Sequence, residues 1–286
     1  MDCIAIDLSK AFDRVDHERL MDKVKGIGLD MRVTGWIGEF LMDRTQQVKI
    51  GEALSTPVKI ERGVPQGSIL GPLLFLIYIN DLGVGLLSRT KLFADDIIIY
   101  REVKVQGDCD ILQNDVNKIQ KWAQVNGMVI NGDKSQVIRF SNKRCPVTSK
   151  YILGGKSVPL DNECRYLGVK MQNTLHWGSH ISTIVSKAYR TLYMIMRVFR
   201  GCSRNVKEMA YKSIVRPQLE YASSAWDPSQ DYLIRELEGV QRKAARFVMG
   251  DFRQHSSVTR MMALLGREEL KSRRQQTRLG NMFRTM

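Results

Sequence analysis

Cysteine is scarce in this chain, and no two cysteines form a close pair. The five cysteines are spread over 286 residues, at Cys3, Cys109, Cys145, Cys164 and Cys202. This spacing favours neither a zinc knuckle nor a disulfide framework. It is typical of a reducing compartment, so we expect an intracellular protein, nuclear or cytoplasmic and not secreted. A signal peptide is not visible either, since residues 1–20 are charged throughout.

Long apolar runs and a helical histidine pair are also missing. The apolar run at residues 69–79 is too short to span a bilayer and predicts a buried helix, so we expect no membrane partner. His176 and His180 stand four apart, but Trp177 and Gly178 lie between them. These two residues argue against a zinc pair on one helix.

Positive charge, in contrast, is abundant and unevenly placed. The chain has a net charge of +14, and residues 187–286 hold 20 Lys and Arg against 9 Asp and Glu. That segment therefore carries +11, and the first 186 residues carry +3. The asymmetry favours contact with nucleic acid, for which Arg242, Lys243 and Arg246 are the candidates. Helices with solvated basic faces remain the alternative.

Two adjacent carboxylates mark a candidate metal site. Asp95 and Asp96 lie between two short apolar runs in residues 91–100, a pattern that predicts a β-hairpin with an acidic tip. Neighbouring carboxylates repel each other unless a cation lies between them. Asp7, at the end of a short apolar strand, is the best candidate for a third ligand of an Mg²⁺ site. A solvated turn and a plain acidic loop are the alternatives.

A glycine-rich turn precedes the apolar run. It contains Gly63, Gln66 and Gly67, and Ser68 is placed to cap the helix that follows. Glycines let the backbone approach a ligand closely, and helix N-termini attract anions. The glycines of this segment, taken alone, are equally compatible with an ordinary turn.

Taken in order, three segments carry a family resemblance. Asp7 followed by Phe12, the Gly-Val-Pro-Gln-Gly-Ser run at 63–68 and the Phe-Ala-Asp-Asp run at 93–96 resemble the palm of a reverse transcriptase. The similarity is to enzymes of LINE-type non-LTR retrotransposons and covers palm and thumb, without most of the fingers. It implies that Asp7, Asp95 and Asp96 are catalytic and bind two Mg²⁺ ions, with Mn²⁺ as an alternative.

The resemblance gives roles to further residues around the nucleotide. Phe12 would lie under the sugar and exclude a 2′-hydroxyl, and Gln66 and Gly67 would line the incoming nucleotide and the template. Lys134 would be a fourth catalytic residue, near the leaving pyrophosphate. An ordinary turn lysine is the alternative for Lys134.

The resemblance also identifies a primer-grip hairpin. It comprises Tyr166, Leu167 and Gly168. A short edge strand is the alternative, and Gly168 would allow the close backbone approach that either interpretation needs.

The implied activity is RNA-directed DNA polymerisation, in which two metal ions assist transfer of dNTPs to a primer 3′-hydroxyl. The implied partners are an RNA template, a DNA primer and dNTPs. Family members carry a fingers subdomain upstream that this sequence does not include, so we expect an open and poorly preorganised nucleotide site. A catalytically inactive nucleic-acid-binding remnant of a retrotransposon polyprotein is one alternative. A structural remnant without a selected function is the other.

The expected architecture is α+β, with a mainly antiparallel sheet and helices on one face. We expect a palm with its primer-grip hairpin at residues 1–174 and a basic helical thumb with a C-terminal extension at 175–286. Expected strands fall at about 3–6, 46–50, 57–61, 91–94, 97–101, 128–130, 136–140, 151–153 and 165–169. Expected apolar helix faces comprise Val33, Trp36, Ile37, Phe40 and Leu41; Leu112, Val116, Ile119 and Ala123; and Ile181, Ile184, Val185, Ala188, Leu192, Ile195 and Met196.

Overall fold

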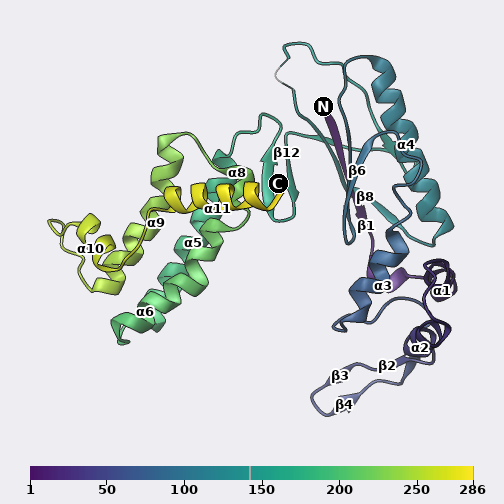
Figure 1. Cartoon of the computed structure of the whole chain (residues 1–286), viewed down its shortest axis with the longest axis horizontal. Coiled ribbons are helices and arrows are strands. Elements are labelled where there is room, and N and C mark those ends of the chain that lie inside the picture. Colours follow the sequence, from purple (N-terminus) through teal and green to yellow (C-terminus); the bar gives the residue numbers. More distant parts are fainter. Residues whose placement is uncertain (142, 286) are drawn as a thin grey trace. The chain divides into compact units, whose positions relative to one another are not determined.

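The computed structural model of the protein describes residues 1–141 and 143–285. The chain divides into two compact units, Met1–Leu167 and Gly168–Met286 (Figure 1). The division lies earlier than the expected boundary between residues 174 and 175, because Val169 and Met171 pack into the apolar core of the second unit.

A five-stranded sheet forms the centre of the first unit, with the strand order β11-β8-β1-β7-β6. All neighbours are antiparallel except β11 and β8, which are parallel. This confirms the mainly antiparallel sheet. The strands are β1 (Asp2–Leu8), β6 (Arg89–Phe93), β7 (Asp96–Arg101), β8 (Ile130–Arg139) and β11 (Leu160–Asp161).

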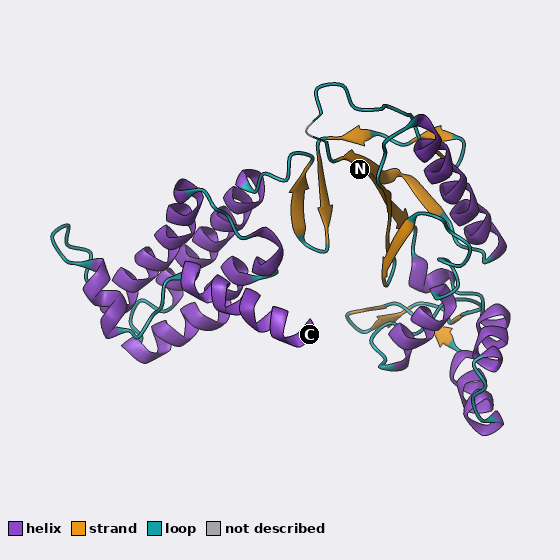
Figure 2. Ribbon diagram, turned by 45° about the horizontal axis from the view of Figure 1, so that its top comes forward, coloured by secondary structure: helices purple, strands orange, loops and turns teal. Residues whose placement is uncertain are grey.

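The helices of the first unit cover one face of this sheet. Ile4, Ile6 and Leu8 of β1 alternate into an apolar core shared with these helices, so Asp7 lies on the opposite face. The predicted face of α4 is buried as expected, and Figure 2 shows this helix along the sheet. The helices are η1 (Ala11–Arg14), α1 (His17–Gly26), α2 (Met31–Leu41), α3 (Leu70–Ile79) and α4 (Gln106–Val125).

The prediction of which residues α2 buries is wrong in part. Ile37 and Leu41 are buried, but Val33 and Trp36 are exposed. The helix also buries Thr34 and Gly38, and a Cβ on Gly38 would lie 3.6 Å from Cε of Met21 on α1. Close approach of the two helices over this small surface turns the larger side chains outward.

Several predicted strands lie outside the sheet. Residues 45–59 form a separate hairpin that projects beyond α2 (Figure 1), and the segments expected to extend the sheet pair in small ladders of their own. The two strands expected at 128–130 and 136–140 are one bulged strand, β8. The small strands are β2 (Thr45–Gln46), β3 (Lys49–Ile50), β4 (Ala53–Leu54), β5 (Val58–Lys59), β9 (Ile152–Leu153), β10 (Lys156–Ser157), β12 (Glu163–Tyr166) and β13 (Val169–Gln172).

The second unit is helical after β13, as expected. The apolar stripe of α5 contributes five fully or nearly buried residues to its core, Ile181, Val185, Ala188, Leu192 and Ile195. A bilayer-spanning helix is not found in the described part of the chain, because no helix there is both long and apolar enough. The elements are α5 (Gly178–Val198), α6 (Arg204–Ala210), the π-helix η2 (Tyr211–Val215), α7 (Arg216–Glu220), α8 (Ser223–Trp226), α9 (Asp231–Met249), α10 (Val258–Leu264) and α11 (Leu270–Thr285).

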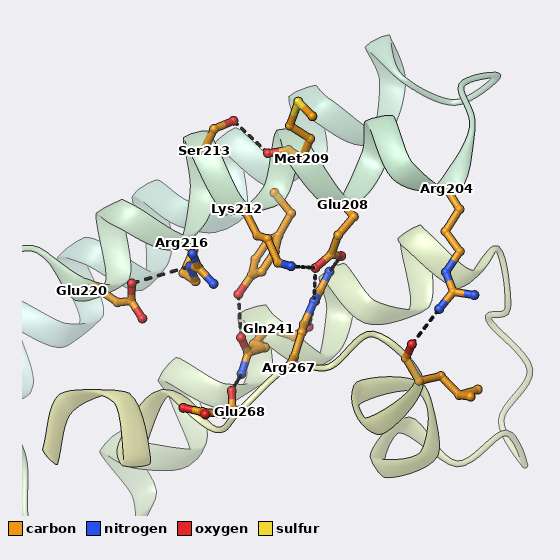
Figure 3. Close-up of polar contacts among 12 residues, drawn as sticks. Arg204, Glu208, Met209, Lys212, Ser213, Arg216, Glu220, Gln241, Arg267 and Glu268 are labelled. Carbon is orange, nitrogen blue, oxygen red and sulfur yellow. Dashed lines mark hydrogen bonds and ion pairs between the residues drawn. The ribbon is translucent and has the colours of Figure 1, made fainter. Parts of the chain in front are cut away.

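A buried polar network ties the second unit together (Figure 3). The Arg267 guanidinium donates to both carboxylate oxygens of Glu208 and to the carbonyl of Gln241. It also lies 4.1 Å from the centre of the Tyr211 ring. The network joins α6, η2, α9 and the segment before α11.

Candidate active site

Asp7 and Asp96 are register partners on adjacent antiparallel strands, β1 and β7. Side chains of directly opposed residues point to the same face of a sheet and lie close together. Asp7 is half-buried and Asp96 is exposed. Asp7 is the next-to-last residue of β1 and Asp96 is the first residue of β7. Both therefore lie at the same end of the sheet, on the face away from the helices.

Asp95 lies in the turn between β6 and β7. The turn has two residues, and Ala94 takes a φ of 51°, the positive value that tight hairpin turns require. Desolvation raises the pKa of Asp96, and the charges of Asp95 and Asp7 raise it further. The structure thus confirms the predicted acidic hairpin and places it beside Asp7.

The short helix η1 carries Phe12, five residues after Asp7. The Phe12 ring stacks on Phe75 of α3, with ring centres 4.4 Å apart and planes 20° apart. The next turn is locked to the glycine-rich loop, since Gly63 donates to the Val15 carbonyl and Val64 donates to the Phe12 carbonyl. Gly63 has a φ of +94°, and a Cβ there would lie 2.9 Å from Cα of Asp13.

Gln66 and Gly67 form the exposed tip of that loop. The Gln66 amide donates to Asp13 Oδ1 at 2.8 Å, so this exposed glutamine is held in place by η1, the short helix that follows β1. Gly67 has a φ of +86° and open space where a Cβ would be. The N-cap of α3 is Ile69 and not Ser68 as predicted, but the Ser68 hydroxyl still accepts a hydrogen bond from the Gly71 N–H in the first turn. Asp13 was not predicted, and no sequence signal distinguishes it from other surface acids.

Lys134 lies in a bulge of β8 next to β1. The register shifts between Ala5, opposite Gln136, and Asp7, opposite Asn131, so the extra residues of β8 stand beside Asp7. Lys134 is exposed, and its N–H donates to Asn131 Oδ1 at 3.3 Å. The structure therefore brings this predicted residue to the same end of the sheet as the carboxylates.

The predicted primer-grip residues form a tight hairpin. Leu167 and Gly168 both have positive φ, 46° and 80°, and connect β12 with β13 in a two-stranded sheet. Burial raises the pKa of the Tyr166 hydroxyl, and the charge of Asp96 adds to this. Tyr166 thus lies within electrostatic range of the carboxylate group.

The three predicted basic residues are on α9 in the second unit, and their surroundings differ. Arg242 is exposed and Lys243 is half-buried, with its ammonium 5.8 Å from the centre of the Phe252 ring. Arg246 donates to the carbonyls of Arg253 and Ser256. Its guanidinium therefore anchors the loop that follows α9.

Within the described residues, no three His, Cys, Asp or Glu side chains are arranged to hold a metal ion as they stand. The carboxylates nevertheless suit hard divalent cations. The charges of Asp95 and Asp7 help to raise the pKa of Asp96, and a cation bound among the three carboxylates would relieve this repulsion.

Comparison with known proteins gives a family and several relatives. Residues 3–171 match the family described as reverse transcriptase (RNA-dependent DNA polymerase). The chain is 31% identical over 254 residues to a probable RNA-directed DNA polymerase from transposon X-element of Drosophila melanogaster. It is 28% identical over 266 residues to the RNA-directed DNA polymerase from mobile element jockey of the same fly. Both alignments cover 86% of this chain.

A solved structure is similar at a lower level. Telomerase from Candida albicans, in complex with a fragment of telomeric RNA, aligns with 93% of this chain and 49% of its own at 12% identity, with a TM-score of 0.47. That likeness is too weak to carry an argument. The chain spans about 28% of the length of the two fly relatives. Because the family match covers more than half of the sequence, the chain belongs to the reverse transcriptase (RNA-dependent DNA polymerase) family.

Proposed function

We propose that the chain supplies the catalytic palm of an RNA-directed DNA polymerase, which transfers nucleotides from dNTPs to a primer 3′-hydroxyl on an RNA template. The observation that carries the proposal is the pairing of Asp7 with Asp96, with Asp95 in the adjoining turn. Family membership supports the reaction class. The proposed setting is the nucleus or cytoplasm, where a retrotransposon RNA and DNA meet.

Asp7, Asp95 and Asp96 would hold two Mg²⁺ ions, with Mn²⁺ as an alternative. Bound divalent ions supply Lewis acidity, which lowers the pKa of the primer hydroxyl and neutralises charge on the leaving pyrophosphate. The protein contributes position: the register of β1 and β7 fixes two carboxylates before any ligand arrives. Such preorganisation supplies much of the catalysis of phosphoryl transfer.

Four other residues would orient the reactants. Phe12 would lie under the sugar, with its ring fixed by Phe75. Gln66 and Gly67 would line the nucleotide and template, with Gln66 held by its hydrogen bond to Asp13. Lys134 would place a positive charge near the pyrophosphate, from the bulge beside Asp7.

The primer and template would contact two further groups. The hairpin of Tyr166, Leu167 and Gly168 would hold the primer end. In the second unit, Arg242 and Lys243 make no ion pair with a described residue, so both charges remain available for phosphates. These uncommitted charges also favour the second candidate, a nucleic-acid binder without catalysis.

Primer extension on an RNA template with dNTPs and Mg²⁺ tests the proposal. The parent chain should extend the primer, and the double variant Asp95→Asn, Asp96→Asn should not, although it should bind primer–template with nearly unchanged affinity. Asp110→Asn, which removes an exposed carboxylate from α4, is the matched control and should extend normally.

Two results would overturn the proposal for this chain. Equal extension by the double variant would remove the carboxylates from the reaction. A folded parent chain that binds primer–template without extending it would establish the second candidate.

A further inference from the structure

The bulge in β8 contains a buried hydroxyl that bridges two strands. Ser135 is fully buried, and its Oγ accepts a hydrogen bond from the Asp7 N–H at 3.3 Å. The same hydroxyl donates to the Asn131 carbonyl at 2.7 Å. The hydroxyl thus donates within β8 and accepts from the neighbouring strand β1.

The bulge explains why a side chain makes this bridge. In a regular antiparallel ladder, a carbonyl of β8 would accept from the Asp7 N–H. The ladder pairs Asp7 with Asn131 but shifts register between Ala5 and Asp7, so β8 carries extra residues beside Asp7. Ser135 is one of these residues, and its Oγ gives the Asp7 N–H a side-chain acceptor at the point of the shift.

The second bond of the hydroxyl reaches the bulge that carries Lys134. Asn131 lies at the start of that bulge, and its side-chain Oδ1 accepts from the Lys134 N–H. A short chain of hydrogen bonds therefore runs from the Asp7 backbone through Ser135 to Asn131 and on to Lys134.

We propose that Ser135 is a positioning residue that fixes Asp7 and the β8 bulge that carries Lys134 in one arrangement. The inference rests on the proposed function, in which Asp7 binds a divalent ion and Lys134 lies near the pyrophosphate. Ser135 itself touches neither ion nor substrate. Its hydroxyl acts through the backbone of a ligand, as hydrogen bonds behind metal ligands do in other sites.

Two measurements on the full chain test this without requiring catalysis. Amide hydrogen exchange at Asp7 reports the bond to Ser135, and a Mn²⁺ titration followed by electron paramagnetic resonance reports the carboxylate site. Ser135→Ala should accelerate exchange at Asp7 about 10-fold and raise the Mn²⁺ dissociation constant about 10-fold. Ser135→Thr keeps a hydroxyl and should restore both.

Ser88→Ala is the matched control, because Ser88 is also buried but precedes the far end of β6. It should leave both readouts unchanged. A purely structural serine would lower the melting temperature without altering Mn²⁺ affinity, and unchanged affinity in folded Ser135→Ala would overturn the inference.

Asp7→Asn separates this inference from the proposed function. If it leaves Mn²⁺ binding intact, the metal assignment fails, and the exchange rate at Asp7 still decides whether Ser135 holds that residue. If Asp7→Asn abolishes binding and Ser135→Ala does not weaken it, the metal assignment stands and the role of Ser135 is refuted.

Discussion

Asp7 faces Asp96 across the central strand pair of the first unit, as direct register partners at the end of β1 and β7. Like charges placed directly opposite each other weaken a sheet. The arrangement is therefore unfavourable for folding without a cation and favourable for binding one. This conflict between stability and ligand binding is measurable.

Asp96→Asn should stabilise the metal-free protein at pH 7, by about 0.2–1 kcal/mol, because it removes one of two opposed charges. The pKa of Asp96 is raised by desolvation and by Asp95 and Asp7, so its stabilising protonated form is lost as pH rises through that pKa. The advantage of the variant should therefore vanish below the ordinary value of 3.8. Thermal melts from pH 7 to pH 3 without divalent ions measure this.

Mg²⁺ provides the complementary measurement. It should raise the melting temperature of the parent chain more than that of Asp96→Asn, since ligand binding stabilises the folded state. Asp110→Asn should behave like the parent. If Asp96→Asn is less stable than the parent at pH 7, Asp96 makes favourable contacts that outweigh its repulsion with Asp7.

Gly71→Ala should destabilise the first unit and loosen the Gln66 loop. An added Cβ would lie 2.3 Å from the Pro65 carbonyl oxygen, so backbone must move, at a cost of about 1–3 kcal/mol. Gly83→Ala is the control, because nothing lies within 4 Å of its Cβ position. Urea unfolding of both variants checks the difference, and equal midpoints would contradict the close packing of loop and helix.

The sequence predicted those parts of the site that depend on local pattern. The Asp95–Asp96 turn follows from the apolar runs on either side of it. The stripes of α4 and α5 follow from a helical period. Each of these features is decided by neighbours in the chain.

Features decided by distant contacts could not be predicted in the same way. Ser135 looks like any strand serine until the register of β8 against β1 places a bulge beside Asp7. The hairpin at 45–59 alternates apolar and polar residues, as at Val48, Lys49 and Ile50, and this pattern alone does not determine which strands pair. The face of α2 depends on the fit of Gly38 against Met21, which helical periodicity does not contain.

Phe12→Ala should reduce the preference for dNTPs over ribonucleotides, because a bulky ring under the sugar would clash with a 2′-hydroxyl. It should also cost about 2 kcal/mol of stability, less than for a fully buried ring, because the stack on Phe75 is removed. Phe40→Ala, which disturbs a looser stack with Trp36 at 6.3 Å, controls for stability alone. The incorporation ratio of the two nucleotides is the measurement, and an unchanged ratio would leave Phe12 a packing residue.

Arg242→Gln combined with Lys243→Gln should weaken primer–template binding. The slope of log Kd against log salt should fall by about 1 for each phosphate that these side chains no longer neutralise. Arg246→Gln should act differently, since it releases the carbonyls of Arg253 and Ser256 and lowers stability. A double variant of Lys25 and Arg32, both exposed on the first unit, controls for net charge. An unchanged slope would mean that the α9 cations face only solvent.

Glu208→Gln should flatten the acid dependence of stability in the second unit (Figure 3). Burial favours a raised pKa for Glu208, but hydrogen bonds from Arg267 and Lys212 outweigh it and lower the pKa. A lowered pKa gives stability that is present above the ordinary value of 4.5 and lost as pH falls through the folded value. Melts from pH 7 to pH 3 should therefore fall less steeply for Glu208→Gln than for the parent or for Glu236→Gln, an exposed control on α9. Parallel acid profiles for the parent and Glu208→Gln would show that the pair contributes nothing to this dependence.

Arg267→Met should lower the free energy of unfolding by about 3 kcal/mol at pH 7, because it removes the main partner of a buried carboxylate.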